Sequence, residues 1–241
     1  GTNINGGCGS TEPGLLRDAV TRHRADVGLA FDGDADRVIA VDHTGALVDG
    51  DQLLALFAVD MRERGRLAED TVVVTVMTNL GFRLAMQDRG IRVEVTQVGD
   101  RHVLEALDRH GWSLGGEQSG HVIFRDLATT GDGVLTGLVL LDLMARSERL
   151  LADLTATAMT RLPQVLRNVP VENRDGLDGA EAVWAEVAAV EAELKGQGRV
   201  LLRPSGTEPY IRVMVEAPTE AAAEEAATRL AAVVSRSLGS A

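Results

Sequence analysis

Apolar and polar positions follow two rhythms along the chain, which predict alternating strands and helices. Short apolar runs at Val27–Phe31 and Val38–Asp42 have the length of buried strands. Further on, strands are predicted at Thr71–Met77, Ile91–Val95 and Trp112–Gly115, and helices at Asn79–Arg89, Arg101–His110 and Gly131–Arg146. This alternation is typical of an α/β layer built on a parallel or mixed sheet.

The pattern changes after Pro163, which ends a helical stretch. A strand is predicted at Val165–Val171, and the apolar residues of 183–194 recur at helical spacing. Two strands follow, Arg199–Leu202 and Tyr210–Glu216, and an alanine-rich helix comes last. The sequence therefore predicts a compact β-α-β-β-α unit behind the α/β layer.

Composition narrows the classes of protein that the chain can represent. With 241 residues, of which 45% are hydrophobic, it can form two or three small domains. The formal net charge of −12 opposes nonspecific binding to nucleic acid or to an anionic membrane, so we expect neither partner. Cys8 is the only cysteine, and no apolar run has the length of a membrane span. We therefore expect a cytoplasmic protein.

Three carboxylates occupy alternate positions in Asp32-Gly33-Asp34-Ala35-Asp36-Arg37. Carboxylates that lie close together repel one another unless a cation lies among them, and oxygen ligands suit Mg²⁺ or Ca²⁺. An EF-hand is excluded, because its sixth and twelfth positions require Gly and Glu where this chain has Arg37 and His43. An acidic hairpin turn is the alternative. A metal beside Arg37 favours an anionic substrate such as a phosphate.

A phosphate-binding loop is predicted at Arg203–Pro209, between two strands. It combines a planar guanidinium, two hydroxyls and a glycine that lets the backbone approach an anion, supplied by Arg203, Ser205, Thr207 and Gly206. Arg212 lies on the next strand, on the face opposite to its apolar neighbours, from which it could reach the same phosphate. An ordinary connecting loop is the alternative.

Two further polar segments carry weaker signals. The turn Gly115–His121 offers a carboxylate, a hydroxyl and an imidazole from Glu117, Ser119 and His121. This set suits sugar hydroxyls, although a plain polar turn is the simpler interpretation. Asp100 and Arg101 lie where a strand leads into a helix; Asp100 is interpreted as the helix N-cap, with orientation of a polar substrate as the alternative.

Seven motifs in this order resemble the α-D-phosphohexomutase superfamily, and within it the bacterial enzymes that act on glucosamine phosphates. The motifs are Gly1–Asn5 with Cys8–Thr11, Gly28–Arg37, Val48–Gln52, Val98–Arg101, Gly115–His121, Thr130–Gly133 and Arg203–Pro209. The resemblance implies an α/β protein in which residues 1–48 end a second domain, 49–162 form a third with a mixed sheet, and 163–241 form a fourth with a TBP-like β-α-β-β-α fold.

The resemblance also implies an activity. The superfamily member would be an isomerase that interconverts glucosamine 6-phosphate and glucosamine 1-phosphate through a phosphoserine and a bisphosphorylated intermediate, on the route to UDP-N-acetylglucosamine and peptidoglycan. Its partner would be the phosphosugar, and a homodimer is possible. The implied metal ligands for Mg²⁺ are Asp32, Asp34 and Asp36, and the implied catalytic residues are Arg37, Asp100 and Arg101. The implied substrate contacts are Glu117, Ser119, His121, Arg203, Ser205, Gly206, Thr207 and Arg212.

The chain departs from the superfamily pattern in ways that affect its expected activity. Glu12 and His102 stand where the family usually has histidine and tyrosine. No Ser-His-Asn-Pro-like phosphoserine loop occurs in the 241 residues, which begin with Gly1. We therefore expect the carboxyl-terminal portion of a longer enzyme, inactive by itself. The alternatives are a noncatalytic fragment that binds Mg²⁺ and a phosphosugar, and a phosphomannomutase or phosphoglucomutase.

Overall fold

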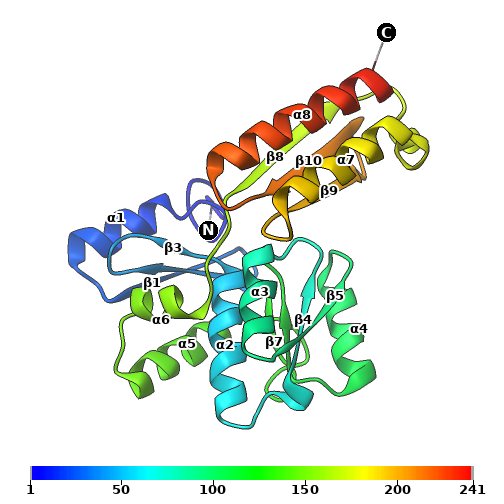
Figure 1. The fold of residues 1–241 in the computed structure, drawn as a ribbon. Helices are drawn as coiled ribbons and strands as arrows, with labels where there is room; N and C mark the ends of the chain where they lie inside the picture. The colour runs from blue at the N-terminus through cyan, green and yellow to red at the C-terminus, as the bar shows by residue number, and fades with distance from the viewer. Residues whose placement is uncertain (1, 240–241) are drawn as a thin grey trace. The chain divides into compact units, whose positions relative to one another are not determined.

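The computed structural model describes residues 2–239 and divides the chain into two compact units, Gly1–Thr160 and Arg161–Ala241 (Figure 1). Each unit has a hydrophobic core of its own. The clusters of the first unit draw on buried residues between Val38 and Met159, and that of the second on residues between Val169 and Leu238. The boundary that the sequence predicts near residue 48 lies inside the first unit and stays a prediction.

The first unit contains the alternating strands and helices that the sequence predicts. Its helices are α1 (Gly14–His23), α2 (Gly50–Glu63), α3 (Leu80–Asp88), α4 (Asp100–His110), α5 (Gly133–Ser147) and α6 (Leu151–Ala158), with a short 3₁₀ helix η1 at Ala68–Asp70. Its strands are β1 (Val27–Phe31), β2 (Val38–Asp42), β3 (Leu47–Val48), β4 (Thr71–Thr75), β5 (Arg92–Thr96), β6 (Leu114–Gly116) and β7 (Val122–Phe124).

A four-stranded mixed sheet with the order β5-β4-β6-β7 forms the larger layer of the first unit. Strand β4 runs parallel to β5 and β6, whereas β7 is antiparallel to β6. Successive residues of β4 serve opposite faces: Val73 packs with Val103 of α4, and Val72 belongs to the main core with Phe57 of α2. Helices thus cover both faces of this sheet, which confirms the predicted α/β layer.

The smaller sheet of this unit is antiparallel, with the order β1-β2-β3. Helix α1 lies against the face from which Gly28 projects, because a Cβ there would collide with Leu16 of that helix. The next residue, Leu29, faces Gly137 of α5 on the other side. The six residues between β1 and β2 are the predicted metal loop, which therefore emerges from a strand pair held between two helices.

The second unit is the predicted β-α-β-β-α fold. Its elements are β8 (Gln164–Pro170), a 3₁₀ helix η2 (Arg174–Gly179), α7 (Glu181–Leu194), β9 (Arg199–Pro204), β10 (Tyr210–Glu216) and α8 (Glu220–Leu238). The strands form an antiparallel sheet in the order β8-β10-β9. Helices α7 and α8 pack side by side against it, on the face of the buried Ile211, Val213 and Val215 (Figure 1). The predicted fold class is therefore confirmed.

Among the helices of residues 2–239, none combines the length and the apolar character that crossing a membrane requires.

Candidate functional site

The aspartate loop, residues 32–37, brings its three carboxylates together. One oxygen from each of Asp32, Asp34 and Asp36 lies within 4.8 Å of the others. The loop turns sharply because Ala35 adopts a left-handed conformation, with φ of 58°, and donates its N–H to the Asp32 carbonyl oxygen at 3.2 Å. Three convergent carboxylate oxygens form a donor set that fits a hard divalent cation.

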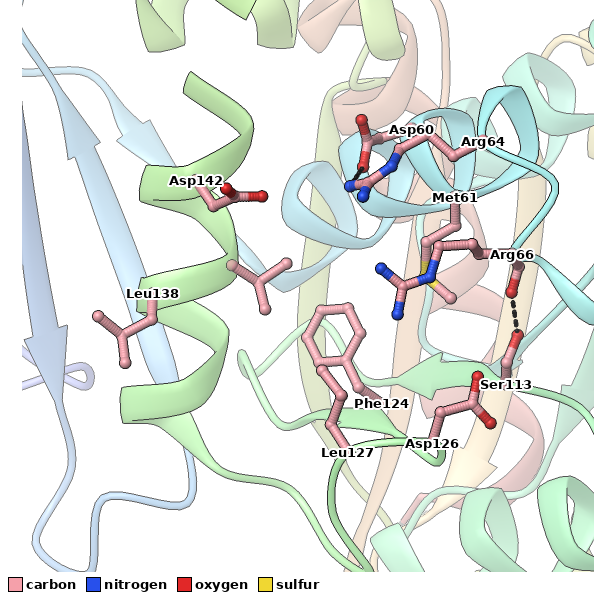
Figure 2. A pocket seen from close by; sticks show the side chains of 11 residues that line it. Asp60, Met61, Arg64, Arg66, Ser113, Phe124, Asp126, Leu127, Leu138 and Asp142 are labelled. Carbon is pink, nitrogen blue, oxygen red and sulfur yellow. Dashed lines mark hydrogen bonds and ion pairs between the residues drawn. The ribbon is translucent and has the colours of Figure 1, made fainter. Parts of the chain in front are cut away.

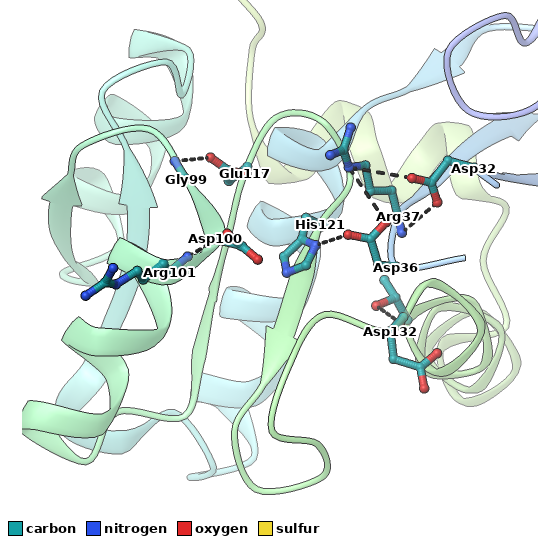
Figure 3. A network of polar contacts seen from close by, with 10 residues as sticks. Asp32, Asp36, Arg37, Gly99, Asp100, Arg101, Glu117, His121 and Asp132 are labelled. Carbon is teal, nitrogen blue, oxygen red and sulfur yellow. Dashed lines mark hydrogen bonds and ion pairs between the residues drawn. The ribbon is translucent and has the colours of Figure 1, made fainter. Parts of the chain in front are cut away.

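Arg37 lies over this cluster (Figure 3). Its Nε is 3.7 Å from Oδ2 of Asp32 and 3.8 Å from Oδ1 of Asp36, and its backbone N–H donates to the Asp32 carboxylate at 3.2 Å. The side chain of Arg37 is 45% exposed. The guanidinium therefore balances part of the negative charge and still has a free surface that an anion could contact.

A second loop, the glutamate loop (residues 117–121), lies next to the aspartate loop and contacts the residues at its end. Val38 donates its N–H to the Gly120 carbonyl oxygen at 3.1 Å, and Arg37 forms an isolated antiparallel bridge with His121. Gly120 has φ of 92°, and a Cβ there would overlap the carbonyl oxygen of Val38. Only glycine allows this close approach.

The imidazole of His121 completes the connection between the two loops. Its Nδ1 lies 2.9 Å from Oδ2 of Asp36 (Figure 3). The start of α5 also contacts the aspartate loop, because Gly133 donates its N–H to the Ala35 carbonyl oxygen at 2.8 Å. Asp132 caps this helix by accepting a hydrogen bond from the N–H of Leu135. The structure therefore brings three of the motifs, 32–37, 117–121 and 130–133, into one constellation.

Helix α2 contacts the glutamate loop from its other side, a role that is not predicted from the sequence. Gly50 donates its N–H to the Gln118 carbonyl oxygen at 3.0 Å, and a Cβ at Gly50 would overlap the backbone of Glu117. A reciprocal capping box between Asp49 and Gln52 fixes the start of this helix. A helix that opens at Asp49-Gly50-Asp51 is predicted from the sequence and is confirmed, whereas its contact with the glutamate loop is long-range.

The predicted residues Asp100 and Arg101 lie at the start of α4 (Figure 3). Gly99 donates its N–H to Oε1 of Glu117 at 3.0 Å, so the turn before α4 is joined to the glutamate loop. The interpretation of Asp100 as the N-cap is wrong: Gly99 takes that position with φ of 126°, and Asp100 is the first helical residue. Arg101 hydrogen-bonds Glu105 at 2.8 Å, which raises the pKa of Arg101, and its side chain points to solvent.

The loop Arg203–Pro209 of the second unit, called the arginine loop, lies between β9 and β10. Arg203 and Arg212 are directly opposite each other in this strand pair. Ser205 is buried and donates its N–H to the Tyr210 carbonyl oxygen at 2.9 Å. Gly206 and Thr207 are exposed at the tip. Two guanidinium groups on facing positions repel each other, so an anion near them would stabilise the pair.

Two details of the arginine loop were not predicted from the sequence. Arg174 of η2 donates from Nη1 to the carbonyl oxygen of Ser205 at 2.8 Å and to that of Gly206 at 3.4 Å, which holds the loop in place. The Nε of Arg212 is buried and has no hydrogen-bond partner among residues 2–239. No local motif connects Arg174 to the loop, because the contact is long-range.

A separate cavity of about 290 Å³ opens in the first unit between α2, α5 and the segment after β7 (Figure 2). The residues that line it include apolar Met61, Phe124 and Leu138 and charged Arg66 and Asp126. The residues that line it do not include any of those predicted for the site. The cavity is therefore distinct from the constellation around the aspartate loop.

Two models of one protein family match the chain. The alpha/beta/alpha domain III of phosphoglucomutase/phosphomannomutase matches residues 49–162, and the C-terminal domain of the same family matches residues 166–233. Together the matches cover about three quarters of the chain. The chain belongs to the phosphoglucomutase/phosphomannomutase family, which confirms the resemblance predicted from the motifs.

Curated relatives that are 55–59% identical to the chain are named phosphoglucosamine mutase. Phosphoglucosamine mutase of Streptomyces coelicolor is 59% identical over 239 residues, which are 99% of this chain and 53% of that protein. Phosphoglucosamine mutase of Saccharopolyspora erythraea is 58% identical over 234 residues, 97% of this chain and 52% of that protein. The chain therefore spans about half the length of the curated relatives that it matches.

Solved structures share the fold at low sequence identity. One is N-acetylphosphoglucosamine mutase of Aspergillus fumigatus in complex with GlcNAc-6P and magnesium, with a TM-score of 0.75 and 23% identity over 95% of this chain and 53% of that one. A phosphoglucomutase/phosphomannomutase family protein of Burkholderia thailandensis gives a TM-score of 0.76 at 22% identity, covering 95% of this chain and 50% of that one. These similarities show that the fold is shared.

Proposed function

We propose that this chain forms the metal-, sugar- and phosphate-binding part of a phosphoglucosamine mutase, which interconverts glucosamine 6-phosphate and glucosamine 1-phosphate. The observation that carries the proposal is the aspartate loop, whose three carboxylates converge beside Arg37. The relatives that are 55–59% identical to the chain support glucosamine as the sugar. The product would enter UDP-N-acetylglucosamine formation in the cytoplasm.

In this proposal Asp32, Asp34 and Asp36 hold Mg²⁺, because their oxygens converge and oxygen donors are those that Mg²⁺ prefers. When bound, the ion would neutralise negative charge on the phosphoryl group that is being transferred. Arg37 acts on the same charge with its exposed guanidinium, which the two flanking carboxylates hold in position. An arginine side chain that moved freely would stabilise this charge less, so the fixed position of Arg37 strengthens its effect.

The glutamate loop would orient the sugar through Glu117 and Ser119. Ser119 is exposed and available to a hydroxyl, and Glu117 is fixed by the N–H of Gly99. The arginine loop would hold the phosphate that does not react, through two facing guanidinium groups and the hydroxyl and backbone groups between them: Arg203, Ser205, Gly206, Thr207 and Arg212. The substrate reacts at one end and then at the other. In each half-reaction the same loop would bind the phosphate that is not reacting, so its binding energy is available in both.

The phosphoserine would come from polypeptide outside these 241 residues. The sequence contains no Ser-His-Asn-Pro-like loop, and the curated relatives are about twice as long as the matched region. We therefore expect that glucosamine 6-phosphate stays unconverted when it is incubated with Mg²⁺, glucose 1,6-bisphosphate and this chain alone. Addition of the amino-terminal half of the Streptomyces coelicolor relative is expected to give turnover, which coupled detection of glucosamine 1-phosphate would measure.

A noncatalytic binding protein is the second candidate, because the chain has the binding loops without the nucleophile. It predicts that the phosphosugar binds and that the added amino-terminal half never produces turnover. Robust conversion by the chain alone would contradict both candidates. A phosphomannomutase or phosphoglucomutase is distinguished by the sugar: parallel assays with glucosamine, glucose and mannose phosphates are expected to show the highest kcat/KM for glucosamine.

A further inference from the structure

His121 belongs to the glutamate loop, yet its side chain is turned inward and is only 3% exposed. Its Nδ1 contacts Oδ2 of Asp36 at 2.9 Å. On the opposite side of the ring, Nε2 has no hydrogen-bond partner within the described residues. Gly131 lies against that edge so closely that a Cβ there would overlap the imidazole. The ring is thus held in one orientation, with Nδ1 toward the aspartate loop (Figure 3).

The two carboxylate oxygens of Asp36 are in different situations. Oδ2 is the oxygen that meets His121, and because an ionised carboxylate only accepts hydrogen bonds, Nδ1 carries the proton of this contact. Oδ1 is buried, has no hydrogen-bond partner in residues 2–239, and lies 3.8 Å from Nε of Arg37. One oxygen is therefore fixed by a neighbour, while the other is left for a ligand that approaches the cluster.

We propose that His121 is a positioning residue for the metal ligand Asp36. The inference rests on the proposed function of the aspartate loop as a cation site. The Nδ1–H donor holds Oδ2 and so keeps the carboxylate from rotating, which leaves Oδ1, the oxygen without a hydrogen-bond partner among residues 2–239, for a cation bound with Asp32 and Asp34. Because His121 ends the glutamate loop, the same contact couples cation binding to the conformation of that loop.

The test compares Mn²⁺ affinity among variants of the 241-residue chain, measured by the loss of the free Mn²⁺ signal in electron paramagnetic resonance. Mn²⁺ takes the oxygen donors that Mg²⁺ takes. His121→Asn places an amide N–H at the same number of bonds from Cα as Nδ1, whereas His121→Gln places it at the position of Nε2. We expect wild-type affinity to fall roughly 10- to 100-fold in His121→Ala and His121→Gln. In His121→Asn it should stay within about threefold of wild type, because the donor to Asp36 is kept.

Three further measurements separate positioning from damage to the fold. Gly131→Ala pushes on the ring from its Nε2 side without removing it, and is expected to weaken Mn²⁺ binding as well. Thermal unfolding of each variant, without metal, identifies any that fail to fold. Long-range ¹H–¹⁵N correlation of the wild-type imidazole is expected to show the proton on Nδ1, which reports the contact in the absence of metal.

The outcomes distinguish the inference from the function on which it rests. Equal Mn²⁺ affinity in wild type, His121→Ala and His121→Gln would overturn the positioning role and leave the cation site standing. Equal loss in His121→Asn and His121→Ala, with both variants folded, would overturn the role of the Nδ1 donor. No binding by the wild-type chain, or binding that persists in Asp34→Asn, would instead contradict the aspartate loop as a cation site.

Discussion

Arg203 and Arg212 face each other across β9 and β10, an arrangement of like charges that costs stability unless an anion lies between them. The buried, unpartnered Nε of Arg212, as seen in residues 2–239, indicates the same need. An anion that binds only the folded state stabilises it in proportion to its affinity. Inorganic phosphate should therefore act as a stabilising ligand of the second unit.

Substitution of Arg212 tests this expectation at the residue scale. Phosphate should raise the thermal unfolding temperature of the wild-type chain, and Arg212→Met should weaken phosphate binding on the order of tenfold or more. Arg167→Met is the matched control, because Arg167 lies on β8 of the same sheet and pairs with Glu224. Calorimetric scans with and without phosphate measure both. A full phosphate effect in Arg212→Met would exclude the pair as the anchor.

Local spacing explains which site residues could be predicted from the sequence. The alternate carboxylates of the aspartate loop are visible within six residues, and so is the polar composition of the arginine loop. The contact between Asp36 and His121 joins residues 85 positions apart, and Arg174 reaches Ser205 from 31 positions away. Contacts of this kind depend on how the elements pack, so a local sequence motif does not predict them.

At the scale of elements, Gly120 is the point where the glutamate loop meets β2. It combines φ of 92° with the Val38 carbonyl oxygen in the place of a Cβ. Gly120→Ala is expected to lower the free energy of unfolding of the first unit by about 2 kcal/mol or more, because strain and overlap add. Urea denaturation measures the loss.

Gly65→Ala provides the control for Gly120→Ala. Gly65 also has a positive φ, 66°, but nothing lies within 4 Å of its Cβ position. Gly65→Ala should lower the free energy of unfolding by only about 1 kcal/mol, because it adds backbone strain without a steric overlap. If the two alanine variants lose the same stability, the close contact between the glutamate loop and β2 is not a constraint on the fold.

The predicted elements agree with the structure where an apolar run has sharp polar ends. Strands β1, β2 and β10 have the bounds that the sequence predicts, and β8 is shifted by one residue. The start of α4 was misassigned because a glycine with φ of 126° precedes Asp100, and backbone conformation at glycine is not encoded by side-chain pattern. The 3₁₀ helix η2 was missed because its six residues are too few for a periodic signal.

At the scale of the whole molecule, each hydrophobic cluster takes its residues from one unit only. The two units are therefore expected to unfold in separate transitions. The chain has two tryptophans, with Trp112 in the first unit and Trp184 in the second. Trp184→Phe leaves a reporter of the first unit, and Trp112→Phe one of the second. Fluorescence during urea denaturation should give different midpoints, and coincident curves from both variants would contradict independent folding.

The overall organisation was predicted from the periodicity and the order of the motifs, but the extent of the compact units was not. The mixed α/β layer and the β-α-β-β-α unit follow from periodicity, and the order of the motifs indicated the family. The domain boundaries were predicted from the resemblance to the superfamily. The compact units are instead defined by contacts between residues, which group residues 1–160 in one unit. Burial against a neighbouring element depends on coordinates and is not visible in the sequence.

The aspartate loop is expected to hold one divalent cation for phosphosugar chemistry. The most direct test is the stoichiometry of Mn²⁺ bound to the chain at saturation, with Asp34→Asn as the comparison because Asp34 is exposed and its substitution spares the core. We predict one Mn²⁺ per wild-type chain, displaced by Mg²⁺, and loss of that site in Asp34→Asn. No stoichiometric Mn²⁺ in the wild type, or one Mn²⁺ retained in Asp34→Asn, would contradict a cation site in the aspartate loop.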